Sequence, residues 1–81
     1  MSLPTALLRG YELIRQGCRD AGEVRAVMYR TMQSEPGVEP DYAEILDESL
    51  RSPEVLAGEL RLLVAARVGL PRLIDNMGVT I

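Results

Sequence analysis

The chain has 81 residues, so we expect a single domain over residues 1–81 with a modest core, because chains this short bury only about 60% of their unfolded surface. Hydrophobic residues make up 47% of the sequence, which excludes a disordered tail. The net charge is −3, and the nine basic residues are all Arg and are spread along the chain. A basic nucleic-acid-binding stripe is therefore excluded, and no segment approaches the ~18 apolar residues of a membrane span.

The sequence predicts a reducing, cytoplasmic setting. Cys18 is the one cysteine and has no partner for an internal disulfide, and nothing resembles a secretory signal peptide. With no His to hold it as a thiolate, Cys18 is expected to be a packing residue rather than a nucleophile. Residues 1–3 have the character of a cloning remnant.

A first helix is predicted over residues 4–16. Gly10 weakens it by about 1 kcal/mol relative to Ala, and Gly17 is a plausible stop just past its end. Its apolar stripe has the helical period, with Leu8 beside it, and consists of Leu7, Tyr11, Ile14 and Cys18.

A second helix is predicted over residues 21–34. Asp20 serves as its N-cap, with Glu23 three residues on as in a capping box, and Pro36 ends it. Its stripe, widened by Val27 and Thr31, consists of Ala21, Val24, Met28 and Met32. The short link to the first helix predicts an antiparallel helical pair.

Three strands are predicted after the helices, over residues 42–46, 60–68 and 72–77, with one helical turn over 53–57 capped by Ser52. In the second strand one face is wholly apolar, which is typical of an antiparallel sheet, and consists of Leu60, Leu62, Val64, Ala66 and Val68. Its other face carries Arg61, Leu63, Ala65 and Arg67. The predicted fold is α+β: two antiparallel helices packed on a small antiparallel sheet of about three strands.

The sequence lacks most of the residue types and motifs from which active sites are built. There is no His, no Lys, no Cys-x-x-Cys and no glycine-rich phosphate loop, so we predict no catalytic, cofactor-binding or metal-binding residue in this chain. Asp41 and Asp47 are expected to be solvated strand ends. Tyr42 is expected to be a packing residue.

The turn between the second and third strands carries the remaining candidates. Arg67 and Arg72 are expected to be cross-strand neighbours, which repel unless an anion or a carboxylate lies between them. Two interpretations stay open: these arginines, or Arg61, bind phosphate, or they pair with Asp75 or Glu44. The docking candidates, facing another domain, are Arg67, Arg72, Asp75 and Asn76.

Three segments resemble the pantothenate synthetase (pantoate–β-alanine ligase) family in order and spacing. The residues before them, Leu7–Gln33, resemble the family's paired helices. Pro71 departs from the family pattern and is expected to alter the local turn. The three segments are Asp41-Tyr42 with Ile45-Leu-Asp47, Leu62–Gly69, and Arg72-Leu-Ile-Asp-Asn76.

The resemblance implies the C-terminal lid domain of a two-domain, ATP- and magnesium-dependent cytoplasmic ligase. We expect the fragment to be inactive by itself. Such enzymes adenylate pantoate, release pyrophosphate, and let β-alanine displace AMP to form pantothenate. The family's catalytic motifs lie upstream, in an N-terminal Rossmann domain that is absent here, so no residue of this chain inherits a catalytic role. The resemblance also implies a homodimeric parent enzyme.

Two other hypotheses stay open. The chain is a stand-alone α+β module for protein–protein interaction, or a small independent enzyme. The residues encoded before this chain in its gene discriminate the lid domain from the interaction module. Catalytic turnover by the chain alone would identify it as an independent enzyme.

Overall fold

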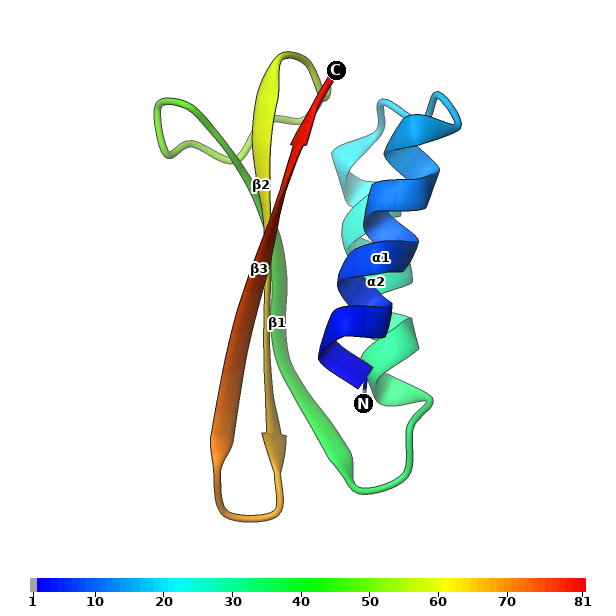
Figure 1. Ribbon diagram of the computed structural model, residues 1–81, viewed down its shortest axis with the longest axis vertical. Helices are drawn as coiled ribbons and strands as arrows, with labels where there is room; N and C mark the ends of the chain where they lie inside the picture. The colour runs from blue at the N-terminus through cyan, green and yellow to red at the C-terminus, as the bar shows by residue number, and fades with distance from the viewer. Residues whose placement is uncertain (1) are drawn as a thin grey trace.

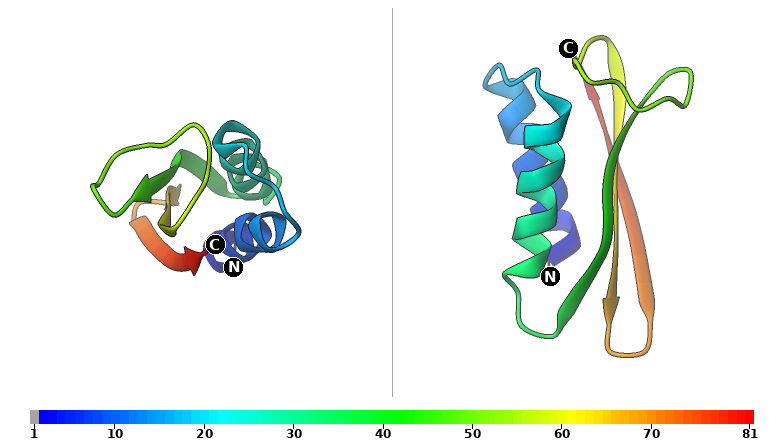
Figure 2. Two further views of the ribbon diagram at one scale, coloured as in Figure 1. Left: turned by 90° about the horizontal axis from the view of Figure 1, so that it is seen from above. Right: turned by 180° about the vertical axis from the view of Figure 1, so that it is seen from behind.

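The computed structural model describes residues 2–81 as two helices followed by three strands, in two layers (Figure 1). Helices α1 (Ser2–Arg15) and α2 (Ala21–Gln33) form one layer, and α1 contacts β2 and β3 while α2 contacts β1. Figure 2 shows the same helical pair covering one side of the sheet from above and from behind. The predicted α+β class and antiparallel helical pair are confirmed.

Helix α1 begins at Ser2, earlier than predicted, and Leu3 is buried in the core. Met1 lies outside the described residues, and the expectation that residues 1–3 are a cloning remnant stays a prediction. Leu8 is half exposed and does not belong to the stripe, because it lies off the face that the sheet covers. The buried face of α1 consists of Leu3, Ala6, Leu7, Gly10 and Ile14.

Glycine ends α1 as predicted. Gly17 has φ +108°, its N–H donates to the Ile14 carbonyl at 3.1 Å, and the Cys18 N–H donates to the Leu13 carbonyl at 3.0 Å. These two bonds satisfy carbonyls that the last turn leaves free, as in a Schellman motif. The chain can therefore reverse within a few residues and start α2 beside α1.

The start and the stripe of α2 are confirmed. The Asp20 carboxylate accepts a hydrogen bond from the Glu23 N–H at 3.3 Å. All four stripe residues are buried: Ala21, Val24, Met28 and Met32. Met28 packs over Gly10, where a Cβ would lie only 2.7 Å from the Met28 sulfur. Gly10 is thus a point of close helix–helix approach, which explains why a helix-weakening residue occupies it.

The sheet is an antiparallel meander in the order β1-β2-β3. The strands are longer than predicted: β1 is Val38–Asp47, β2 is Glu59–Val68 and β3 is Arg72–Thr80. A register shift between Pro40 and Tyr42 leaves Asp41 without a paired residue on β2. Because Pro40 cannot donate to a ladder, its place on an edge strand beside a bulge is a common solution.

The inner face of the sheet packs on the helices, and the outer face is the side opposite them. Leu62, Val64 and Ala66 of β2 are fully buried on the inner face, as predicted. Val68 was expected to continue this face but is 36% exposed, because the β2–β3 hairpin extends past the helices at the lower end of Figure 1. Ala65 points the other way yet is also fully buried.

The predicted helical turn over residues 53–57 is wrong. This segment is extended and pairs with the link between the helices: Val55 forms a bridge with Asp20, and the Leu56 N–H donates to the Arg19 carbonyl at 2.9 Å. Leu56 is buried in the core while Val55 is largely exposed. Burial of Leu56 and these backbone bonds outweigh the weak helical signal of so short a segment.

Candidate functional site

The candidate arginines lie at the hairpin end of the sheet. Arg67 and Arg72 are register partners on β2 and β3, which confirms that they are cross-strand neighbours. They lie on the outer face, since they alternate with the buried Ala66 and the partly buried Leu73. Among residues 2–81, Arg67 forms no ion pair.

The partner of Arg72 is Asp41. Arg72 Nη2 lies 2.7 Å from Asp41 Oδ2, and the guanidinium lies 5.9 Å from the centre of the Tyr42 ring. The expectation that Asp75 or Glu44 pairs with Arg72 is therefore wrong. The bulge explains the difference: Asp41 is the extra residue between Pro40 and Tyr42, and the long Arg72 side chain from β3 reaches it across β2.

This contact lies on the outer face of the sheet. We call the three residues that form it, Asp41, Tyr42 and Arg72, the strap. Both partners of the ion pair are about half exposed, so the pair contributes at most about 1 kcal/mol to stability. Ala65 lies in register with Tyr42 on one side and Ile74 on the other, and these neighbours account for its complete burial. Asp41 is thus more than the solvated strand end that was expected.

The predicted pair Asp75 and Asn76 is split between the two faces. Asp75 is the register partner of the inner-facing Val64, and its Oδ1 accepts from the Asn76 N–H at 2.8 Å. The Asn76 side chain lies on the outer face, where its Oδ1 accepts from Arg61 at 3.3 Å. The four predicted docking residues therefore do not form one cluster: Arg67 and Arg72 lie together, Asn76 lies further along the same face, and Asp75 lies on the other.

Glu44 forms a second polar cluster, which was not predicted as such. Glu44 Oε1 accepts from Ser52 Oγ at 2.6 Å, from the Ile45 N–H at 3.0 Å and from Arg25 Nη1 at 3.3 Å. Burial acts to raise the pKa of Glu44, but the hydrogen bonds and the charge of Arg25 outweigh it and leave that pKa below its ordinary value. The cluster joins α2, β1 and the loop before β2, so its role is structural.

Other titratable groups do not converge on a reaction centre. Asp47 accepts from the N–H groups of Ser49 and Arg51, which closes the turn after β1. The Cys18 thiol donates to Glu23 Oε2 at 3.6 Å. In the part of the chain that the structure describes, no three His, Cys, Asp or Glu residues are grouped so as to hold a metal ion.

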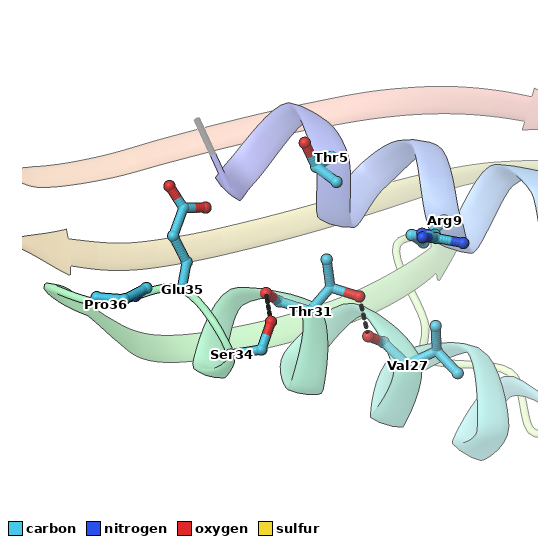
Figure 3. Close-up of a pocket in the computed structure, with 7 residues that line it drawn as sticks. All are labelled: Thr5, Arg9, Val27, Thr31, Ser34, Glu35 and Pro36. Carbon is cyan, nitrogen blue, oxygen red and sulfur yellow. Dashed lines mark hydrogen bonds between the residues drawn. The ribbon is translucent and has the colours of Figure 1, made fainter.

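A hollow of about 540 Å³ lies between α1 and α2 (Figure 3). Two of its polar side chains are engaged with the backbone of α2: Thr31 Oγ1 donates to the Val27 carbonyl at 2.7 Å, and Ser34 Oγ donates to the Thr31 carbonyl at 2.9 Å. Arg9 and Glu35 lie at opposite ends of the hollow in Figure 3. The hollow therefore offers a ligand no set of converging groups.

The sequence and fold match one family over nearly the whole chain. The profile of the family described as Pantoate-beta-alanine ligase matches residues 2–78. The chain belongs to the pantoate–β-alanine ligase family. The resemblance seen in the sequence is thus confirmed.

Members of the pantoate–β-alanine ligase family with similar sequences are much longer than this chain. Pantothenate synthetase from Heliobacterium modesticaldum is 42% identical over 80 residues, covering 98% of this chain and 28% of its own. That from Salinispora arenicola is 44% identical over 80 residues, with the same coverage. A crystal structure of the Thermus thermophilus pantothenate synthetase superposes with a TM-score of 0.82 at 30% identity, covering 94% of this chain and 28% of that one. The chain thus spans about 28% of their length and corresponds to their C-terminal region.

Proposed function

We propose that this chain is the C-terminal lid domain of an ATP-dependent ligase that condenses pantoate with β-alanine. In the proposed reaction ATP adenylates pantoate and releases pyrophosphate, and the β-alanine amine then displaces AMP to form pantothenate. The observation that carries the proposal is the family match over residues 2–78 in a chain that spans only 28% of its relatives.

The chemical inventory supports a non-catalytic role for this part of the ligase. The chain has no His and no Lys, and the described residues present no metal-ligand cluster and no glycine-rich loop for a nucleotide. ATP and magnesium do not fit the residues present, so we assign both to a preceding Rossmann domain. A cytoplasmic location and a homodimeric parent enzyme belong to the same proposal.

A lid has a physical reason in such a reaction. An acyl adenylate hydrolyses if water reaches it, and closure of a second domain excludes water while it completes the site. A lid needs a stable fold and a surface that meets the catalytic domain. The buried core supports the first of these two requirements.

The test is to assay the 81-residue chain for AMP formation from ATP in the presence of pantoate and β-alanine. We expect no turnover above the buffer blank, with an intact pantothenate synthetase as the positive control. Turnover that depends on both substrates would overturn the assignment of a non-catalytic lid.

A second candidate is a stand-alone module that binds another protein. The exposed Leu70 and Ile74 near the hairpin favour it, since apolar side chains in water often mark an interface. Chromatographic elution of the chain with a partner unrelated to the ligase would support the module, and elution alone would support the lid.

A further inference from the structure

The two edges of the sheet differ in how well they are protected against a further strand. On β1, Pro40 has no N–H to donate, and the bulge at Asp41 interrupts the regular edge. On β3, the register with β2 runs without a shift from Arg72 to Thr80, and this strand contains no proline. Figure 1 shows β3 in front of β2, with no other element of residues 2–81 in front of it. The free edge of β3 is therefore open.

The backbone of β3 has unpaired groups along this edge. Alternate residues of an edge strand direct their N–H and C=O groups away from the neighbouring strand. The Asn76 N–H donates to Asp75 Oδ1 at 2.8 Å, as expected of an amide that lacks a strand partner. Asn76 is also the middle residue of the nine in β3. A strand added at this edge would replace the side-chain acceptor of Asn76 with a backbone carbonyl.

A second copy of β3, running antiparallel, fits this edge best in one register. A two-fold axis at Asn76 pairs all nine residues, because residues equally distant from Asn76 on its two sides then lie opposite one another. Arg72 lies opposite Thr80 and Asp75 lies opposite Met77, so no two like charges are opposed. An axis one residue earlier would instead place the two Asp75 carboxylates together.

This register gives the exposed Ile74 a place to pack. Its side chain is 59% exposed in the single domain and would lie opposite Gly78 of the second copy. The Arg61 guanidinium lies over Gly78, where a Cβ would be only 3.3 Å from Arg61 Nη1. Ile74 would therefore meet no opposing strand side chain and would pack beside the apolar stem of Arg61.

Helix α1 places an exposed leucine on the same side of the molecule. Tyr11 and Arg15 line a hollow together with residues 78–80 of β3, so this flank of α1 lies beside the free edge. Leu8 precedes Tyr11 by three residues and Arg15 by seven, which places it on the same flank. Its side chain is 49% exposed.

The two-fold axis brings the two copies of Leu8 towards each other. Helix α1 and strand β3 run in the same direction (Figure 1). Asn76 precedes Gly78 by two residues, about 7 Å of strand, and Leu8 precedes Tyr11 by three residues, about 4.5 Å of helix. Because Tyr11 lies beside Gly78, Leu8 lies close to the level of Asn76 and therefore of the axis.

We propose that the free edge of β3, with Leu8 and Ile74 beside it, binds a second copy of this chain. The two three-stranded sheets then form one continuous antiparallel sheet with a two-fold axis at Asn76. Backbone hydrogen bonds along β3 and the two apolar side chains of each copy stabilise the pair. The inference goes beyond the proposed function and does not depend on it, because a lid domain and an interaction module can both carry this edge.

The first test measures the mass of the 81-residue chain over a range of concentrations by sedimentation equilibrium. We expect the mass to rise from the 8.9 kDa of one chain towards twice that value. Ile74→Lys places an ammonium group near Arg61 of the second copy at both symmetric positions and should weaken association about ten-fold. Leu50→Lys is the matched control: Leu50 is 79% exposed in the loop after β1, and its substitution should leave association unchanged.

The second test locates the axis by disulfide formation in a Cys18→Ser background. Asn76→Cys places the two cysteines opposite each other, with Cα atoms about 5.5 Å apart, which is within the range of a disulfide. Ile74→Cys places them four residues apart along the strands, about 13 Å, which is too far. On mild oxidation we expect Asn76→Cys to form a linked dimer at least about ten-fold faster than Ile74→Cys.

Three results would overturn the proposal. The first is a chain that stays monomeric at every concentration. The second is equal weakening of association by Ile74→Lys and Leu50→Lys, and the third is Asn76→Cys that links no faster than Ile74→Cys, because both place the contact elsewhere. None of these measurements uses AMP formation, so a failure of this inference is distinguishable from a failure of the proposed function.

Discussion

Gly10→Ala offers a sharp test of how the two helices pack. In an open helix the change would stabilise by about 1 kcal/mol, because Ala has the higher helix propensity. Here a Cβ would lie 2.7 Å from the Met28 sulfur, 2.9 Å from its Cγ and 3.3 Å from a Val24 methyl. Met28 and Val24 are both fully buried, so neither has free space into which to move. Overpacking of this kind costs typically 1–3 kcal/mol.

The net expectation for Gly10→Ala is a loss of about 1 kcal/mol, which lowers the melting temperature of a domain this size by roughly 5 °C. The measurement is thermal unfolding followed by circular dichroism. Gly22→Ala is the matched control, because Gly22 is exposed on α2 and its nearest neighbour is the Asp20 carboxylate at 3.3 Å. A melting temperature for Gly10→Ala above that of the unaltered chain would refute the close approach of α1 and α2.

Three further predictions concern stability. Leu56→Ala should cost about 2–5 kcal/mol in urea unfolding because Leu56 is 1% exposed, whereas Val55→Ala, at 72% exposure, should cost under about 0.5 kcal/mol; equal losses would contradict the placement of this loop. The pKa of Glu44 is lowered on folding, so the ionised carboxylate stabilises the folded domain. Because the group is partly exposed, this contribution to the free energy of unfolding is at most about 1 kcal/mol. It is fully present above the ordinary pKa of Glu and is lost as the pH falls through the lower pKa of the folded state. The stability gap between the unaltered chain and Glu44→Gln should therefore shrink on acidification from pH about 6 to about 3, and a gap independent of pH would contradict it. A double-mutant cycle of Asp41→Asn and Arg72→Gln should give a coupling energy of about 0.5 kcal/mol that falls with added salt. Strictly additive effects would contradict a stabilising ion pair between the two residues.

The fold was largely predictable because its signals are local and periodic. The stripe of α2, the Asp20 cap, the Gly17 stop and the apolar face of β2 as far as Ala66 each follow from spacing alone, and each is confirmed. The termini of the strands were less predictable. Tertiary pairing extends β3 through Gly78 to Thr80, beyond the point where residue preference indicates a strand.

The candidate surface was only partly predictable, because it depends on contacts between distant segments. Spacing across a turn placed Arg67 opposite Arg72. The Asp41 partner depends on the bulge, for which Pro40 in an otherwise strand-like run was the available signal. Counting alternation back from the buried residues of β2 would have shown that Asp75 and Arg72 lie on opposite faces.

The central claim is that this domain contributes to a pantoate–β-alanine ligase only together with a preceding catalytic domain. The most direct test is AMP formation by three proteins: the Heliobacterium modesticaldum enzyme lacking the region matched here, the 81-residue chain alone, and the chimaera that joins the two. We predict that only the chimaera forms AMP in dependence on both pantoate and β-alanine. A chimaera that folds and binds ATP but forms no AMP, or an isolated chain that turns over, would contradict the account.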